Sequence, residues 1–148
     1  MSAGSGTGKA VHADGAAAAA TVLPMIVVRW LWPSPWTALG LLAGLLVWLC
    51  GGQARRREGC LEFVGGGCGR LVARHTPFGA LTLGHVILAT SPREADLLGA
   101  HERLHVRQYE AWGPLFVPAY LAAGAWQWLQ GRCAHADNPF ERAARGPA

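Results

Sequence analysis

Charged side chains are scarce in this 148-residue sequence. Asp, Glu, Lys and Arg make up 15% of it, against roughly 25% in an ordinary soluble domain. Apolar residues account for 51%, which excludes a chain that is disordered throughout. The balance indicates that a membrane segment must be sought first. At this length one folded domain is expected, because a second complete core would need more residues.

Paired cysteine motifs are absent as well. The four cysteines are Cys50, Cys60, Cys68 and Cys133, and none forms a CxxC pair with another. Such pairs are typical of zinc ribbons and thioredoxin-like sites, and dense cysteine is typical of disulfide-rich miniproteins. The sequence therefore excludes those classes and predicts isolated thiols, with Cys50 inside an apolar helix.

Lysine is almost missing, since Lys9 is the only one. The net charge of +4 is a mild bias, and the basic residues do not form a stripe interleaved with aromatics, as a nucleic-acid surface requires. We therefore expect no nucleic-acid partner. Three arginines do cluster, at Arg55, Arg56 and Arg57, and this pattern favours a membrane surface.

One part of the chain is strongly apolar. Residues 1–20 are small, polar or alanine-rich and predict a disordered tail, whereas residues 22–52 predict a membrane anchor, either a single helix or a hairpin. Within the anchor, residues 36–50 carry no charge and make about 22 Å of helix, slightly short of a ~30 Å hydrocarbon core. Gly40 and Gly44 have the spacing of a helix-packing face. Membrane lipid is the expected partner.

Residues 58–146 predict a small α+β unit that follows the anchor. Residues 60–64 alternate apolar and polar side chains before a run of glycines, and residues 82–89 are apolar and β-branched. Both segments predict strands. The arginine cluster just before this unit places it on the cytoplasmic side of the membrane, by the positive-inside tendency.

Helix signals follow the second strand. The segment Ser91-Pro-Arg-Glu94 combines an N-cap, a proline in the first turn and an acid three positions after the cap. The helix that it starts should run to about residue 111 and break at Gly113-Pro114. An apolar helix is expected over residues 115–129, and Asn138-Pro139 predicts a short last helix.

An HExxH motif lies within the helix that begins after Ser91. Positions i and i+4 share one helix face, so His101 and His105 can reach a single metal ion. Glu102 lies about 100° further around the helix, where its carboxylate can take a proton from an attacking water. The spacing therefore predicts two zinc ligands and a general base from one turn of helix.

A catalytic zinc site needs a third protein ligand. Glu141 is 36 residues beyond His105, in the first turn of the predicted last helix. His135 and Asp137 are the competing downstream candidates. If residues 115–129 crossed a bilayer, His105 and Glu141 would lie on opposite sides of it. About 15 residues of helix are too short to span comfortably, so a helix at the interface or packed on the anchor, with Glu141 as ligand, is favoured.

Four further side chains are candidates for positioning the ligands or the substrate. Gln108 is one turn after His105 and can hydrogen-bond a ligand or a substrate carbonyl. Tyr109 and Tyr120 can donate a hydrogen bond to a developing oxyanion. His85, on the strand, is better suited to hydrogen-bonding a metal ligand than to ligating the metal itself.

The HExxH segment with Glu141 resembles the gluzincin class of zinc metallopeptidases. More closely, the chain resembles small bacterial membrane proteins that share an HExxH–Q signature and have no assigned activity. Three segments carry this resemblance, residues 82–88, 101–120 and 137–141. It covers about residues 33–144 and implies that the two histidines and Glu141 ligate zinc and that Glu102 is the catalytic base.

Taken together, these features predict a membrane-anchored, zinc-dependent, peptidase-like hydrolase at the bacterial inner membrane. Its substrate would be a peptide or a segment of a membrane protein, because so short a chain has little room for a deep cleft. The alternative is a non-catalytic membrane scaffold that keeps zinc for folding. A third reading has no metal at all, since a chance HExxH is expected in about one in a hundred chains of this composition.

Overall fold

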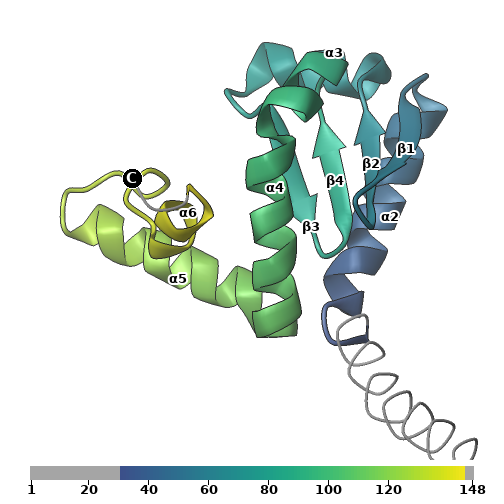
Figure 1. Ribbon diagram of the computed structural model, residues 1–148. Coiled ribbons are helices and arrows are strands. Elements are labelled where there is room, and N and C mark those ends of the chain that lie inside the picture. The colour runs from purple at the N-terminus through teal and green to yellow at the C-terminus, as the bar shows by residue number, and fades with distance from the viewer. Residues whose placement is uncertain (1–30, 146–148) are drawn as a thin grey trace, which may run out of the picture. The chain divides into compact units, whose positions relative to one another are not determined.

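The computed structural model of the chain describes residues 31–145. The elements below belong to the unit that begins at Trp32. In chain order they are α2 (Ser34–Leu49), β1 (Gln53–Arg57), β2 (Cys60–Val64), α3 (Gly66–His75), β3 (Ala80–Leu83), β4 (Val86–Ala89), α4 (Pro92–Trp112), a 3-10 turn (Gly113–Leu115), α5 (Phe116–Leu129) and α6 (Pro139–Ala144) (Figure 1). The predicted tail, and residues 22–30 of the predicted anchor, lie outside the described residues.

Two hairpins make one mixed sheet, with strand order β1-β2-β4-β3. β1 pairs antiparallel with β2, β3 pairs antiparallel with β4, and the parallel pairing of β2 with β4 joins the hairpins. The turn between β1 and β2 is Glu58-Gly59, with φ of 49° and 82°. Positive φ at both positions is the type I′ geometry that fits the twist of the strands. β1 and β3 are the edge strands.

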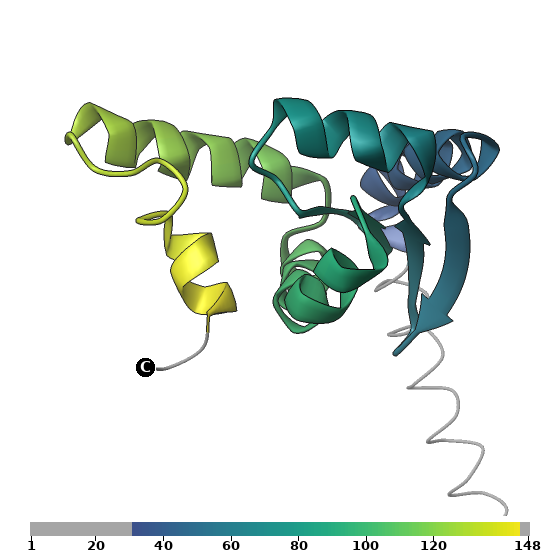
Figure 2. The same cartoon turned by 90° about the horizontal axis from the view of Figure 1, so that it is seen from above.

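Helices α2 and α4 cover opposite faces of the sheet (Figures 1 and 2). On one face, Cys60 and Ile87 form a buried cluster with Val106 of α4. Successive strand residues point to opposite faces, and Phe63 and Val86 pack against α2 on the other face. The sheet is therefore a central layer between two helices, and α4 holds its position through the apolar side chains that it buries.

Helix α2 approaches the sheet through two glycines. A Cβ atom at Gly40 would lie 2.7 Å from the Cβ of Val86, and one at Gly44 would lie 2.2 Å from the ring of Phe63. Neither separation is sterically allowed, so this spacing of glycines lets the helix pack on the sheet. The opposite side of α2 exposes large apolar side chains, namely Leu39, Leu41, Leu42, Leu45, Leu46, Trp48 and Leu49.

The structure confirms the α+β class and most of the predicted elements. The strand over 60–64 and the three predicted helices are present, and Ser91 caps α4 by accepting a hydrogen bond from the Glu94 amide at 3.2 Å. The single strand predicted over 82–89 is wrong. Gly84, with a φ of +61°, starts a two-residue turn that divides this segment into β3 and β4.

Two elements have no counterpart in the sequence-based prediction, β1 and α3. β1 consists largely of the arginine cluster, which the sequence pattern assigned only to a membrane flank. In the fold, Arg55 pairs with Glu62 and Asp96, and Arg57 pairs with Asp96. Arg55 and Arg57 therefore have partners within the fold, while the side of the membrane on which the unit lies stays a prediction.

Within residues 31–145, no helix combines the length and the apolar character needed to cross a membrane. α2 has 16 residues and α5 has 14.

Candidate metal centre

Two helices bring the predicted metal ligands together. His101 and His105 lie on α4, one turn apart on the side that faces α6. Glu141 lies in the first turn of α6, which Asn138 caps by accepting a hydrogen bond from the Phe140 amide at 3.1 Å. Asn138 also donates to the carbonyl of Tyr120 in α5 at 3.0 Å, so the start of α6 is fixed against α5.

The three side chains form a compact cluster of donor atoms. The Nε2 atoms of His101 and His105 are 3.1 Å apart, and they lie 3.2 Å and 3.3 Å from the two carboxylate oxygens of Glu141. A tetrahedral metal ion with ligands at about 2.0–2.1 Å places those ligands about 3.3–3.4 Å apart. The separations fit that geometry, so His101, His105 and Glu141 can hold one metal ion.

Gln108 sets the tautomer of His105. Its side-chain amide donates to the carbonyl of Phe140 at 2.9 Å, which turns the amide oxygen toward Nδ1 of His105 at 2.8 Å. Nδ1 must then carry the proton, and Nε2 keeps the lone pair that faces the cluster. Because Phe140 precedes Glu141, the same amide links α4 to the helix that supplies the third ligand.

The cluster contains a buried negative charge. Glu141 is only 3% exposed. Burial raises the pKa of its carboxyl, but the hydrogen bonds with His105 and Tyr120 outweigh it and hold the pKa at about 2. Burial lowers the pKa of His105, but its hydrogen bonds with Glu141 and Gln108 leave that pKa raised. A buried carboxylate that stays ionised beside two imidazoles is suited to a cation.

Glu102 lies beside the cluster and is held by β3. It is 6% exposed, and the hydroxyl of Thr82 donates to its Oε2 at 2.5 Å. The hydroxyl of Tyr109 donates to the main-chain carbonyl of Thr82 at 3.2 Å. Sequence reasoning did not identify Thr82, because its partner is 20 residues away in the chain and only the fold brings them together.

A cavity of about 710 Å³ opens beside the cluster, and Glu102 and the three ligands line it. This size is within the usual range for small-ligand and peptide pockets. Its other walls come from α2, β3 with the loop before it, α4 and α5. They are mostly apolar and include Trp36, Phe78, Leu81, Leu98, Phe116 and Leu121. The arrangement therefore places a buried carboxylate and a metal-binding cluster at the wall of an apolar cavity.

The remaining candidates occupy different positions. The hydroxyl of Tyr120 donates to Glu141 at 2.6 Å and lies 3.0 Å from Nδ1 of His135, so Tyr120 helps to fix the third ligand. His135 is 3.4 Å from Glu141 on the solvent side. Asp137 instead accepts a hydrogen bond from the Cys133 amide at 2.8 Å, in the turn before α6.

The two other predicted positioning residues have their own partners. Tyr109 is 2% exposed and packs edge-on against Phe116, with ring centroids 4.4 Å apart. Burial raises its pKa, so its hydroxyl stays protonated. His85 lies in the turn between β3 and β4, 3.4 Å from Thr37 and 3.3 Å from Glu110, and it is not among the residues that line the cavity.

Comparison with known proteins identifies no family for this chain. No family model, no curated protein and no solved structure matches it.

Proposed function

We propose that this protein is a zinc-dependent peptidase that uses His101, His105 and Glu141 as metal ligands and Glu102 as the general base. The observation that carries the proposal is the cluster of donor atoms, in which the two imidazole Nε2 atoms are 3.1 Å apart and each lies 3.2–3.3 Å from one carboxylate oxygen of Glu141, with Glu102 on the same cavity wall. Two imidazoles and one carboxylate are a ligand set that zinc prefers, whereas Mg²⁺ and Ca²⁺ prefer oxygen ligands throughout.

Each residue around the metal cluster has a defined task in this proposal. A zinc ion in the cluster supplies Lewis-acid activation of a carbonyl and of water. Glu102 takes the proton from the attacking water and passes it to the leaving amine. The Thr82 hydroxyl holds Oε2 of Glu102 and leaves Oε1 for that transfer. Gln108 and Tyr120 hold His105 and Glu141 in place.

A peptide substrate is favoured by the edge strand next to the site. β3 pairs with β4 on one side only, and its four residues line the cavity. An extended peptide can add to such an edge by main-chain hydrogen bonds, while pockets read alternate side chains. The apolar walls favour large apolar side chains on the substrate, as in a segment of a membrane protein.

The test combines metal content with hydrolysis of a library of apolar peptides by the purified full-length protein. Glu102→Gln should keep about one zinc per chain and lose hydrolysis by roughly 100-fold or more, the usual effect of removing a general base. Glu94→Gln is the matched control, because this glutamate is on the same helix but does not line the cavity. Hydrolysis that is unchanged in Glu102→Gln would contradict the proposal.

A structural zinc site in a non-catalytic scaffold is the second candidate, and His135 is the observation that favours it. Its Nδ1 is 3.4 Å from Glu141, so a movement toward the two histidines would add it as a fourth ligand and close the site. His135→Ala separates the two functions. In a scaffold the substitution weakens zinc binding, whereas in a peptidase zinc affinity stays the same.

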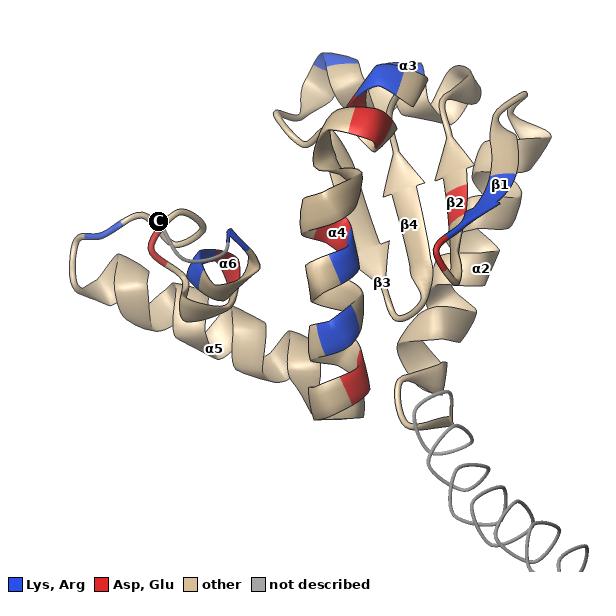
Figure 3. Ribbon diagram, viewed as in Figure 1, with Lys and Arg blue, Asp and Glu red and all other residues tan. Residues whose placement is uncertain are grey.

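We further propose membrane lipid as a partner, with the site on the cytoplasmic side of a bacterial inner membrane. α2 and α5 carry no Lys, Arg, Asp or Glu (Figure 3), and both expose large apolar side chains. Co-flotation of the protein with lipid vesicles tests the association. Labelling of the exposed Cys133 in spheroplasts with a membrane-impermeant maleimide tests the side, and rapid labelling would contradict a cytoplasmic site.

A further inference from the structure

Two cysteines that are 18 residues apart in the chain meet where α2 ends and α3 begins. Cys50 is the C-cap residue of α2, and Cys68 is in the first turn of α3. Their Sγ atoms are 2.7 Å apart. Because a disulfide requires about 2.05 Å, a movement of less than about 1 Å would bring the two sulfur atoms to bonding distance.

The backbone around the pair holds the two helix ends together. The amide of Gly67 donates to the carbonyl of Cys50 at 2.7 Å. At Gly66, whose φ is +69°, a Cβ atom would lie 2.5 Å from the nitrogen of Gly52. Only glycine allows this backbone conformation and this close approach. The glycine run before Cys68 thus fixes the position of α3 against α2.

The other two cysteines have no such neighbour. Cys60 is buried at 5% exposure among the sheet side chains, with its Sγ 4.0 Å from the carbonyl of Glu58. Cys133 is exposed and accepts a hydrogen bond from the Ala136 amide. Cys50 is also exposed, so a soluble oxidant can reach the pair. These positions favour oxidation at one specific pair among the four cysteines.

We propose that Cys50 and Cys68 form a reversible disulfide when they meet a low-molecular-weight disulfide such as oxidised glutathione. One thiolate attacks a sulfur of the oxidant and releases one glutathione thiolate. The second thiolate then attacks the mixed disulfide and releases the other glutathione. The protein loses two protons and two electrons, and two molecules of reduced glutathione carry them. The sequence predicts isolated thiols, and the four cysteines are free, but Cys50 and Cys68 are in contact. The inference does not depend on the proposed peptidase.

The bond would close a loop that contains both β1 and β2. It would tie the C-terminal end of the exposed apolar helix α2 to the first turn of α3. In a reducing cytoplasm the pair stays a dithiol and oxidises only when an oxidant arrives. The hydrogen bond with Cys50 raises the pKa of Cys68, so the rate of oxidation should increase with pH.

The experiment treats the purified full-length protein with oxidised glutathione, alkylates the remaining thiols and maps the peptides by mass spectrometry. Arg55, Arg56 and Arg57 allow trypsin to separate Cys50 from the peptide that contains Cys60 and Cys68, and fragment ions assign the cysteine of that peptide. We expect a Cys50–Cys68 cross-link, with Cys60 and Cys133 alkylated. Oxidation should also raise Tm by several degrees.

Serine variants serve as matched controls. Cys50→Ser and Cys68→Ser should form no cross-link and show no rise in Tm, whereas Cys133→Ser should behave like the wild type. The wild-type peptide map does not require any variant to fold. A mixed glutathione adduct that accumulates on Cys50 without ring closure, or cross-links that involve Cys60 or Cys133 equally, would overturn the proposal.

Discussion

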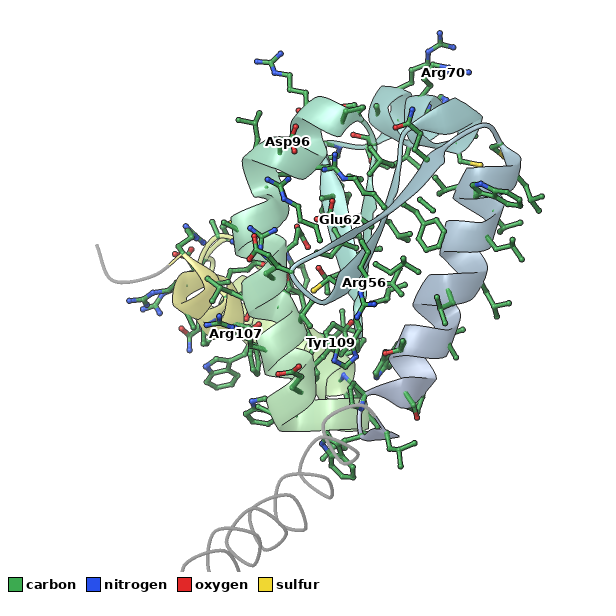
Figure 4. The ribbon with its side chains drawn as sticks, turned by 45° about the vertical axis from the view of Figure 1, so that its right-hand side comes forward. Arg56, Glu62, Arg70, Asp96, Arg107 and Tyr109 are labelled. Atoms are coloured by element: carbon green, nitrogen blue, oxygen red, sulfur yellow. The ribbon has the colours of Figure 1, made fainter. Side chains whose placement is uncertain are left out.

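Two buried carboxylates lie on opposite sides of α4, and their neighbours give them different chemistry. Glu62 of β2 is fully buried, 2.6 Å from Arg55 and 3.9 Å from Arg103 of α4 (Figure 4). Glu141 is 3% exposed and faces His101 and His105 of the same helix. Each acid is therefore a buried carboxylate with at least one basic partner on α4.

The partner side chains decide what each anion can do. An arginine keeps its proton at any ordinary pH and offers no lone pair, and the hydrogen bond with Glu62 raises the pKa of Arg55 further. Glu62 therefore forms internal ion pairs that join β1, β2 and α4. An imidazole can be neutral and offer a lone pair, so the cluster around Glu141 can exchange its protons for a metal ion.

The largest expected effect is on metal binding. His105→Ala should weaken zinc binding by more than about 100-fold, because even the loss of a side chain that only orients a ligand costs 10–100-fold. Zinc content by mass spectrometry and competition with a chelator measure it. Glu62→Gln is the control and should keep full zinc affinity. If both substitutions weakened zinc binding equally, the distinction between the two carboxylates would be wrong.

The second effect is on stability. Glu62→Ala should lower the free energy of unfolding by about 1–3 kcal/mol, because Arg55 loses its nearest partner, although Arg55 keeps Asp96 and Arg103 keeps Glu58. Urea denaturation of the metal-free protein measures the change. The double variant Glu62→Leu, Arg55→Leu should recover part of the loss, since it replaces both members of the 2.6 Å ion pair by apolar side chains. A single variant as stable as the wild type would show that Glu62 is not an essential partner.

The third effect is the pH dependence of the metal-free protein. The pKa of Glu141 falls from 4.5 to about 2 on folding, so its contribution to stability is present above pH 4.5 and is lost as pH falls toward 2. The pKa of His105 is raised above 6.5, so its contribution is complete below pH 6.5 and is lost above it. Stability from this pair should peak between pH 4.5 and 6.5, and Glu141→Gln should flatten the profile measured by denaturation.

The smallest effect concerns the orientation of one ligand. Gln108→Ala should weaken zinc binding by about 10–100-fold, because Nδ1 of His105 loses its acceptor. Gln108→Glu keeps an acceptor for Nδ1 but loses the donor to the Phe140 carbonyl, so it should retain more of the affinity than Gln108→Ala. Isothermal titration with zinc compares the three proteins. An unchanged affinity in Gln108→Ala would show that the tautomer of His105 does not depend on this amide.

The helices of the site can be predicted from local patterns in the sequence. Ser91 and Asn138 cap helices where their local patterns place them, because a capping hydrogen bond spans only two or three residues. The HExxH spacing puts His101 and His105 on one face for the same local reason. The prediction of one continuous strand over residues 82–89 is wrong because only Gly84 marks the turn, and the apolar residues on both sides of it continue the strand pattern.

The sequence by itself determined the HExxH helix, its start and its end, since these depend on hydrogen bonds and side-chain spacing within a few residues. Only the tertiary structure decided which third side chain lies beside the two histidines, because Glu141, His135 and Asp137 all follow α5 and differ only in how the chain turns back after it. It also decided that Arg55 faces Glu62 and that Cys50 meets Cys68. Those contacts join distant segments through the packing of the sheet, and no local pattern encodes them.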